Sequence, residues 1–234
     1  KSVRRLFLEE FWQPTDQGIN MEFANERASS FYKKVFAEFG DDSVIQMGSV
    51  HVAFEYVSQI AAKAIEDQRI GAAYMEKSTR YVRFDLASPG GQFLSMEPSE
   101  IMDSRFNEEF TSWNNKLFEA YKVHIPEVVE HMRRKYPIEN QEFLDSKSKE
   151  TIKYAGMNDE ADKIKAQKAH ERALLAKSLD TIRIFLPTTT VTSLGAHFSG
   201  QAAENAINKM LSSPYSEVRL LGLMAYQELI KVIP

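Results

Sequence analysis

Hydrophobic side chains recur every three or four residues along much of the chain, and this spacing predicts amphipathic helices. The first helix is expected at residues 21–39, where Gly40 would end it. The Asp-Asp-Ser run at 41–43 can cap a second helix, which we expect to continue through residues 50–65. The beginning of the chain is therefore predicted to be helical.

Further helical patterns follow at residues 102–123, 126–135 and 150–177. A last helix is expected with Ser213 as its N-cap and Pro214 at its first helical position, and it should run to about Val232. A Gly-Met-Asn-Asp run at 156–159 is expected to interrupt the third of these helices. The Ser-Pro-Gly-Gly run at 88–91 is the clearest break in the chain. These patterns predict an α+β fold that is predominantly helical. We expect one domain over residues 1–234, with a potential internal break near 88–91.

Composition argues against three classes of protein: membrane-spanning proteins, proteins that depend on cysteine, and nucleic-acid-binding proteins. No apolar run reaches the roughly 18 residues that a membrane-spanning helix needs, and no signal-peptide pattern opens the chain, so we expect a cytoplasmic protein without a membrane partner. The absence of Cys among 234 residues excludes disulfides and thiolate chemistry. A formal net charge of −4 argues against nucleic acid as a partner, because such binding relies on clustered Lys and Arg.

The segment 74–81, Tyr-Met-Glu-Lys-Ser-Thr-Arg-Tyr, is the most informative stretch. If it is extended, Glu76, Ser78 and Arg80 share one face, because side chains alternate along a strand. An acceptor, a hydroxyl and a guanidinium on one face suit a phosphorylated ligand such as a nucleotide. The alternative is an edge strand with a surface ion pair between Glu76 and Arg80, which contributes only about 0–1 kcal/mol.

Two blocks of sequence resemble the flavin-dependent thymidylate synthases. Glu76-x-Ser78-x-Arg80-Tyr81 is similar to the signature of that family, and Arg183-Ile184-Phe185-Leu186-Pro187 is similar to its Arg-x-x-Leu-Pro segment. A Thr-rich turn and a helix that opens near Ser199 follow the second block, as in the family. The resemblance extends from about residue 36 to the C-terminus. It implies a flavin-dependent thymidylate synthase-like fold.

The resemblance also implies a reaction: reductive methylation of dUMP to dTMP, with FAD as cofactor and methylenetetrahydrofolate and NADPH as co-substrates. Such a methyltransferase needs no protein nucleophile, and no catalytic side chain is assigned. The family implies a homo-oligomer. The amino-acid sequences of several segments more closely resemble a divergent branch of the family in which two synthase-like halves are fused. A second synthase-like half is therefore also expected as a partner.

Residues that match family positions form the predicted site. For the nucleotide dUMP they are Glu76, Ser78, Arg80, Arg183 and Lys209, the last of which stands where the family has Arg. For FAD they are His51, Arg69, Ser199, Gln201, Asn205 and Asn208. Gln201, Asn205 and Asn208 would form one polar stripe that offers donors and acceptors to a flavin, although an ordinary solvated helix face has the same pattern. Free backbone amides of Ser199 and Gly200 are expected to bind a phosphate.

The chain departs from the family at the Arg-His-Arg cluster that precedes the first block, because it has Asp67-Gln68-Arg69 there. The upstream family His aligns with Met47, and His51 would substitute for it. The nucleotide side of the site is therefore better preserved than the flavin side. This departure favours the alternative function, a degenerate synthase-like domain with a scaffold, nucleotide-binding or regulatory role. His51 and Glu55 lack a third partner at recognisable spacing, so no metal site is predicted.

Overall fold

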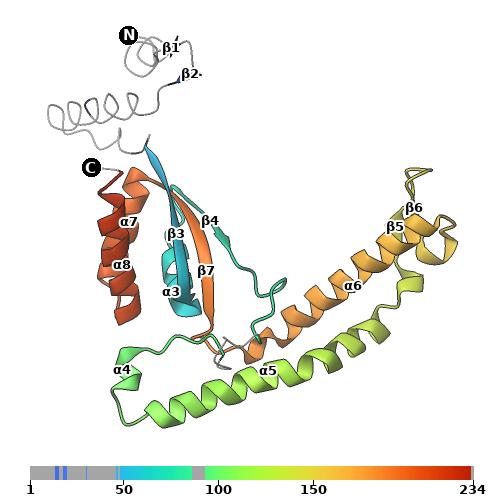
Figure 1. Ribbon diagram of the computed structural model, residues 1–234, viewed down its shortest axis with the longest axis horizontal. Coiled ribbons are helices and arrows are strands. Elements are labelled where there is room, and N and C mark those ends of the chain that lie inside the picture. Colours follow the sequence, from blue (N-terminus) through green and yellow to red (C-terminus); the bar gives the residue numbers. More distant parts are fainter. Residues whose placement is uncertain are drawn as a thin grey trace. The chain divides into compact units, whose positions relative to one another are not determined.

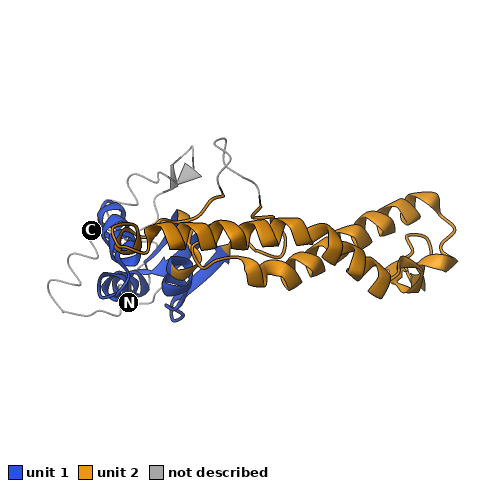
Figure 2. Cartoon of the chain, turned by 90° about the horizontal axis from the view of Figure 1, so that it is seen from below, with its two compact units in different colours: residues 1–55, 61–75, 194–234 blue, residues 56–60, 76–193 orange. Residues whose placement is uncertain are grey.

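The computed structural model describes residues 14–15, 18–19, 30, 46, 48–85 and 93–232. Contacts within the chain define two compact units (Figure 2). Unit 1 comprises residues 1–55, 61–75 and 194–234, and unit 2 comprises residues 56–60 and 76–193.

A three-stranded sheet contains β3 (Ser49–Ser58), β4 (Ala72–Glu76) and β7 (Val191–Ser199). The strand order is β3-β7-β4, so the strand that comes last in the sequence is central (Figure 1). Buried residues alternate with half-buried ones throughout β7, as expected for a central strand that is covered on both faces. Two short strands, β1 (Pro14–Thr15) and β2 (Gly18–Ile19), pair antiparallel elsewhere.

The helix predicted over residues 50–65 is wrong for its first part, since β3 covers Ser49–Ser58 and only α3 (Gln59–Glu66) is helical. Valine and aromatic residues in β3 favour a strand, although the buried Phe54 and Val57 have the three-residue spacing of a helix face. Tyr56 has a φ of 56°, an uncommon value for a residue other than glycine, and it shifts the alternation of buried positions.

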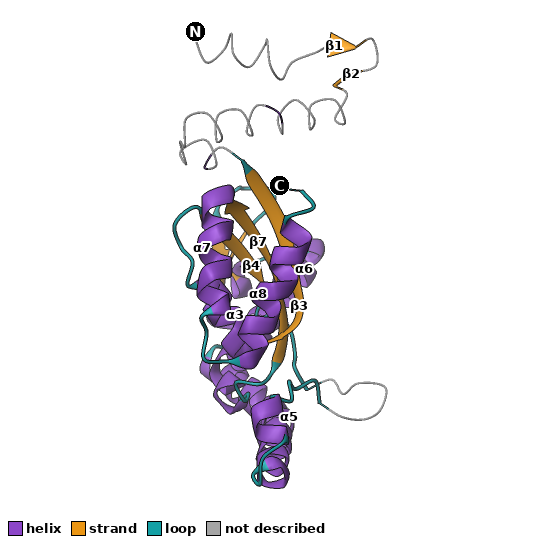
Figure 3. Ribbon diagram, turned by 90° about the vertical axis from the view of Figure 1, so that its left-hand side faces the viewer, coloured by secondary structure: helices purple, strands orange, loops and turns teal. Residues whose placement is uncertain are grey.

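In unit 1, α7 (Gly200–Leu211) and α8 (Ser216–Leu229) pack against each other (Figure 3). The helix expected to open near Ser199 is confirmed, because the Ser199 side chain caps α7 by accepting a hydrogen bond from Ala202 N. The last helix begins later than expected from Ser213, with Tyr215 as its N-cap, and it ends before Val232.

In unit 2, α5 (Asn107–Lys135) and α6 (Glu160–Ile182) form a long pair of helices, preceded by the short α4 (Ser99–Met102). Their shared core holds the buried side chains Phe84, Tyr121, Ile125, Leu179 and Ile182. Two helices were predicted where α5 is continuous, with Pro126 inside it. Proline removes one backbone hydrogen bond, and packing of α5 against α6 compensates for that loss.

The predicted helix at 150–177 begins too early. Residues Thr151–Lys153 form β6, which pairs antiparallel with β5 (Glu142–Leu144), and a turn of 3₁₀ helix follows at Tyr154–Gly156. The Asp159 side chain then caps α6 by accepting from Ala161 N and Asp162 N. The expected interruption at 156–159 therefore lies directly before α6, which begins at Glu160.

Short 3₁₀ helices also occur at Ile138–Asn140 and at Arg183–Phe185, directly after α6. The expected mixture of helices and a sheet, with helix predominating, is confirmed. No helix in the described part of the chain is both long and apolar enough to cross a membrane. Apart from Ser30, the helix predicted at 21–39 lies outside the described residues, as do the cap at 41–43, Met47 and the break at 88–91.

Candidate functional site

The segment 74–81 is extended only as far as Glu76. Glu76, Ser78 and Arg80 therefore do not share one face of a strand, as was predicted for an extended segment. Strand β4 ends at Glu76, and a turn begins at Ser78, whose carbonyl accepts from Tyr81 N at 3.2 Å and from Val82 N at 3.1 Å. The Ser78 hydroxyl accepts from Arg80 N at 3.3 Å. A serine that binds nearby amides in this way competes with the strand ladder and favours a turn.

Two arginines far apart in the sequence converge on one carboxylate of unit 2. Arg80 Nε lies 3.0 Å from Asp180 Oδ1, and Arg183 Nη2 lies 3.1 Å from the same oxygen. Arg183 Nη1 also donates to Thr79 Oγ1 at 3.3 Å, which ties the arginine to the turn that carries Arg80. The structure therefore brings together two of the predicted nucleotide-binding residues and adds Asp180, which the sequence analysis missed.

The arginine side chains of this cluster are accessible to a ligand. Arg80 is 54% exposed and Arg183 is 43% exposed. With two guanidiniums and one carboxylate, the cluster carries a formal charge of +1. Such a cluster attracts an anion, and planar guanidiniums match the oxygens of a phosphate.

Arg83, the next arginine along the chain, has a different role. Its Nε donates to Asp85 Oδ1 at 2.9 Å, and Nη2 binds the second oxygen of the same buried carboxyl. This hydrogen bonding holds the pKa of Asp85 below its usual range. Arg83 is therefore paired within unit 2 and is not part of the Arg80–Arg183 cluster.

In unit 1, Lys209 contacts the loop that replaces the Arg-His-Arg cluster. Lys209 Nζ donates to Gln68 Oε1 at 2.9 Å, and Gln68 Nε2 donates to the carbonyl of Ile70 at 3.1 Å. Gln68 is buried, and its backbone carbonyl accepts a hydrogen bond from the hydroxyl of Tyr74 at 2.6 Å. Burial raises the pKa of Tyr74 to about 12, so this phenol remains a donor. Lys209 was predicted to bind the nucleotide, and it is bound by the protein itself.

The amides at the start of α7 are not free, contrary to expectation. Ser199 N donates to the carbonyl of Gly71 at 2.8 Å, and Gly200 N donates to the carbonyl of Gly48 at 3.0 Å. The Ser199 hydroxyl already caps Ala202 N. The phosphate site predicted from free amides of Ser199 and Gly200 is therefore absent in the described structure.

Gly71 explains how the loop after α3 reaches α7. It has a φ of +71°, and an added Cβ would lie 2.7 Å from Ser199 Oγ and 3.1 Å from Ala202 Cβ. Only glycine combines that conformation with such a close approach. The loop that carries Gln68 and Arg69 is thereby held against the helix start.

The remaining residues predicted for FAD also lie in unit 1. Asn205 and Asn208 are exposed and Gln201 is half-buried, opposite the buried Ala203 and Met210, so the polar stripe of α7 is confirmed as a surface feature. Its role stays a prediction, because a solvated helix face has the same arrangement.

Asp67 is exposed and pairs with Lys63. This hydrogen bond lowers the pKa of Asp67. Arg69 is exposed in the same loop.

His51 does not lie one helical turn from Glu55, because both residues are on strand β3, where four residues span roughly 13 Å. Its ring instead contacts the ring of His197 on β7, with 4.7 Å between centroids. No group of three or more His, Asp or Glu side chains in the described ranges could hold a metal ion.

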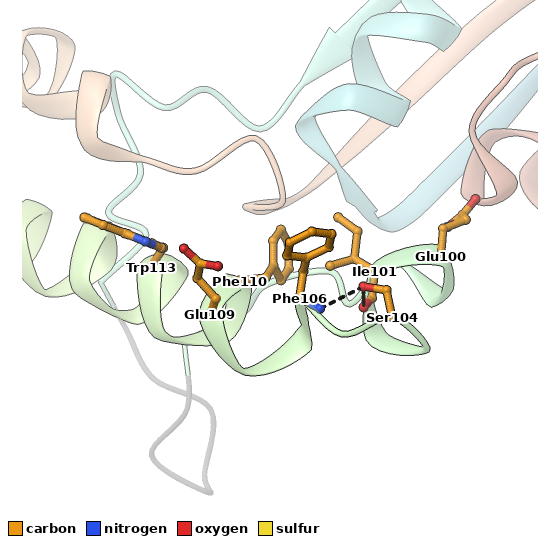
Figure 4. A pocket seen from close by; sticks show the side chains of 7 residues that line it. All are labelled: Glu100, Ile101, Ser104, Phe106, Glu109, Phe110 and Trp113. Carbon is orange, nitrogen blue, oxygen red and sulfur yellow. Dashed lines mark hydrogen bonds between the residues drawn. The ribbon is translucent and has the colours of Figure 1, made fainter.

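A concavity of about 620 Å³ lies on unit 2 between α4 and the first turns of α5 (Figure 4). Its lining residues are Glu100, Ile101, Ser104, Phe106, Glu109, Phe110 and Trp113. It is open to solvent and contains none of the residues predicted for dUMP or FAD.

Known proteins resemble this chain along almost its full length. The family model described as "Thymidylate synthase complementing protein" matches residues 4–234. A UPF0159 protein of Chlamydia pneumoniae is 36% identical over 99% of this chain and 40% of its own length. A UPF0159 protein of Chlamydia muridarum is 35% identical over 97% of this chain and 37% of its own length.

A UPF0159 protein of Thermoplasma acidophilum is 30% identical over 97% of this chain and 46% of its own length. The chain therefore spans less than half of the length of each of these three relatives. Their names state no activity.

Proposed function

Because the chain belongs to the family of thymidylate synthase complementing proteins, the flavin-dependent thymidylate synthases, we propose that it binds dUMP for reductive methylation to dTMP. Methylenetetrahydrofolate would be the one-carbon donor, and FAD with NADPH would supply the reducing equivalents. Since the chain spans less than half of its curated relatives, we propose that it carries the nucleotide side of a larger or oligomeric enzyme.

The observation that carries this proposal is the convergence of Arg80 and Arg183. These residues come from the two blocks that match the family, and they lie within 3.0 and 3.1 Å of the same carboxylate oxygen. A phosphate beside Asp180 would be reached by both guanidiniums. Charge-assisted hydrogen bonds from arginine to phosphate are among the stronger contacts available to a protein.

The described residues fit FAD less well. A pyrophosphate needs cations or free backbone amides, and three amides at the start of α7 are already bound within unit 1. Lys209 is bound to Gln68, and only Arg69 remains of the family's cationic cluster. The described chain therefore lacks a complete pyrophosphate site, and we assign no step of the reaction to FAD. A second copy or a second synthase-like half would have to supply the missing cations.

A second candidate function is a nucleotide-binding scaffold or regulatory domain without turnover. The Lys209–Gln68 contact favours it, because this contact occupies two positions that bind ligands in the family. Both candidates require dUMP or a related nucleotide to bind, and they differ in whether thymidylate is formed.

Removal of the Arg80 guanidinium tests the proposal. Arg80→Ala should weaken dUMP binding roughly 10- to 150-fold, because a hydrogen bond between charged groups contributes about 1.5–3 kcal/mol. Isothermal titration calorimetry on the purified chain measures this change.

Arg133→Ala is the matched control. Arg133 is also an exposed arginine of unit 2, paired with Glu130 and Glu171 at 2.9 Å. Arg83→Ala is unsuitable, since it would leave the buried Asp85 carboxylate without its partner. Equal effects of Arg80→Ala and Arg133→Ala on dUMP affinity would contradict the proposed site.

A further inference from the structure

Asp180 lies in the last turn of α6, three residues before Arg183, and it has no counterpart among the residues that the sequence motifs indicated. One of its carboxylate oxygens, Oδ1, lies within 3.1 Å of a nitrogen from each arginine. The side chain is 32% exposed, less than either arginine. Asp180 is thus the common anchor of both guanidiniums.

Nothing else in the described structure holds both arginines. Arg183 has a second contact, to Thr79 Oγ1 at 3.3 Å, whereas the side chain of Arg80 has Asp180 as its only ion-pair partner among the described residues. Half-exposed arginines have many accessible rotamers, and a ligand that must order them loses affinity. An anchor that orders both beforehand removes that cost.

We propose that Asp180 is a positioning residue that holds the guanidiniums of Arg80 and Arg183 in the orientation that a nucleotide phosphate requires. This inference rests on the proposed function of the same site. Asp180 acts through the two arginines and does not touch the ligand. Its ion pair with Arg80 is to Nε, so the two terminal nitrogens of that guanidinium remain available to a phosphate.

A simple charge argument gives the opposite expectation. Asp180 is an anion beside a site for an anion, so its removal should strengthen phosphate binding if Coulomb repulsion were its main effect. Positioning predicts weaker binding on removal. The direction of the change therefore separates the two roles.

Asp180→Asn is the test, because it removes the charge and preserves the shape of the side chain. We expect dUMP to bind roughly 5- to 100-fold more weakly, since two long side chains must then be ordered at binding. Asp180→Glu should retain part of the affinity that Asp180→Asn loses, because it keeps a carboxylate, although one methylene further from the backbone. Unchanged or tighter dUMP binding by Asp180→Asn would overturn the proposal.

Glu171→Gln is the matched control. Glu171 is another carboxylate of α6 that pairs with an arginine, Arg133, at 2.9 Å, so its removal deletes a similar ion pair from the same helix. It should leave dUMP affinity unchanged. The thermal unfolding midpoints of both variants show whether a loss of affinity comes from a loss of fold.

A second readout needs no ligand. In ¹⁵N-labelled protein, the Nε–Hε signal of Arg80, assigned by its absence in Arg80→Lys, should be sharp in the wild type. It should broaden or disappear in Asp180→Asn. If the wild type binds no dUMP, the proposed function fails, and this signal still decides the inference. An Arg80 signal that is the same with and without Asp180 would refute the positioning role.

Discussion

Lys209 and Gln68 are in contact although 141 positions separate them in the sequence. Each stands where the family has a different residue, and the structure joins the two departures in one hydrogen bond of 2.9 Å. Gln68 also donates to Ile70 O, so its amide links α7 to the loop after α3. We infer that Lys209 stabilises this loop, which differs from the nucleotide contact that sequence alone predicted.

Lys209→Met should therefore lower the free energy of unfolding by about 1–3 kcal/mol, because the buried Gln68 side chain loses a charged donor. Chemical denaturation of the purified chain measures the change. Lys209→Arg, which retains a charged donor, is the control. In a Gln68→Met background, the effect of Lys209→Met should shrink toward zero. Equal losses in both backgrounds would show that the two residues are not coupled.

At the scale of helices and strands, sequence periodicity located α7, α8 and most of α5 and α6, and it failed where two patterns compete. In β3, apolar residues at 54 and 57 mimic a helix face, and the irregular backbone at Tyr56 disturbs the alternation that would have indicated a strand. Pro126 led to the prediction of two helices where α5 is continuous. The packing that stabilises a helix through a proline cannot be inferred from the local sequence pattern. The strand β7 was missed because its Thr-rich beginning was assigned to a turn, although the buried Leu194, Ala196 and Phe198 alternate with half-buried residues as in a strand.

The contact between α7 and α8 depends on Gly222. A Cβ at this position would lie 2.9 Å from Met210 Cβ and 3.3 Å from the backbone nitrogen of Leu211. Gly222→Ala should destabilise unit 1 by about 1–3 kcal/mol, because the helices must move apart to relieve this overlap. Thermal unfolding followed by circular dichroism measures the effect.

Gly156→Ala is the control for this substitution, since nothing lies within 4 Å of a Cβ added there. It should change stability by far less than Gly222→Ala. If both substitutions lowered the unfolding midpoint equally, close packing at Gly222 would not be the cause.

At the scale of the whole chain, the two sequence blocks predicted the family and both arginines of the cluster. Sequence gave no indication that Asp180 joins them, although its position three residues before Arg183 places it on the same side of a helix. It also gave no indication that the start of α7 uses its amides within the protein, because backbone hydrogen bonds depend on the tertiary fold. The predicted dUMP residues Glu76, Ser78, Arg80 and Arg183 lie in unit 2, and Lys209 and the predicted FAD residues lie in unit 1.

The proposed nucleotide site, with an incomplete pyrophosphate site among the described residues, makes a specific prediction for catalysis. Tritium release from 5-tritiated dUMP should be measured with FAD, NADPH and methylenetetrahydrofolate, at dUMP concentrations that calorimetry shows to saturate the chain. We expect saturable dUMP binding but tritium release close to that of a protein-free control. Rapid release by these 234 residues alone would contradict the proposal that the described residues form an incomplete pyrophosphate site for FAD.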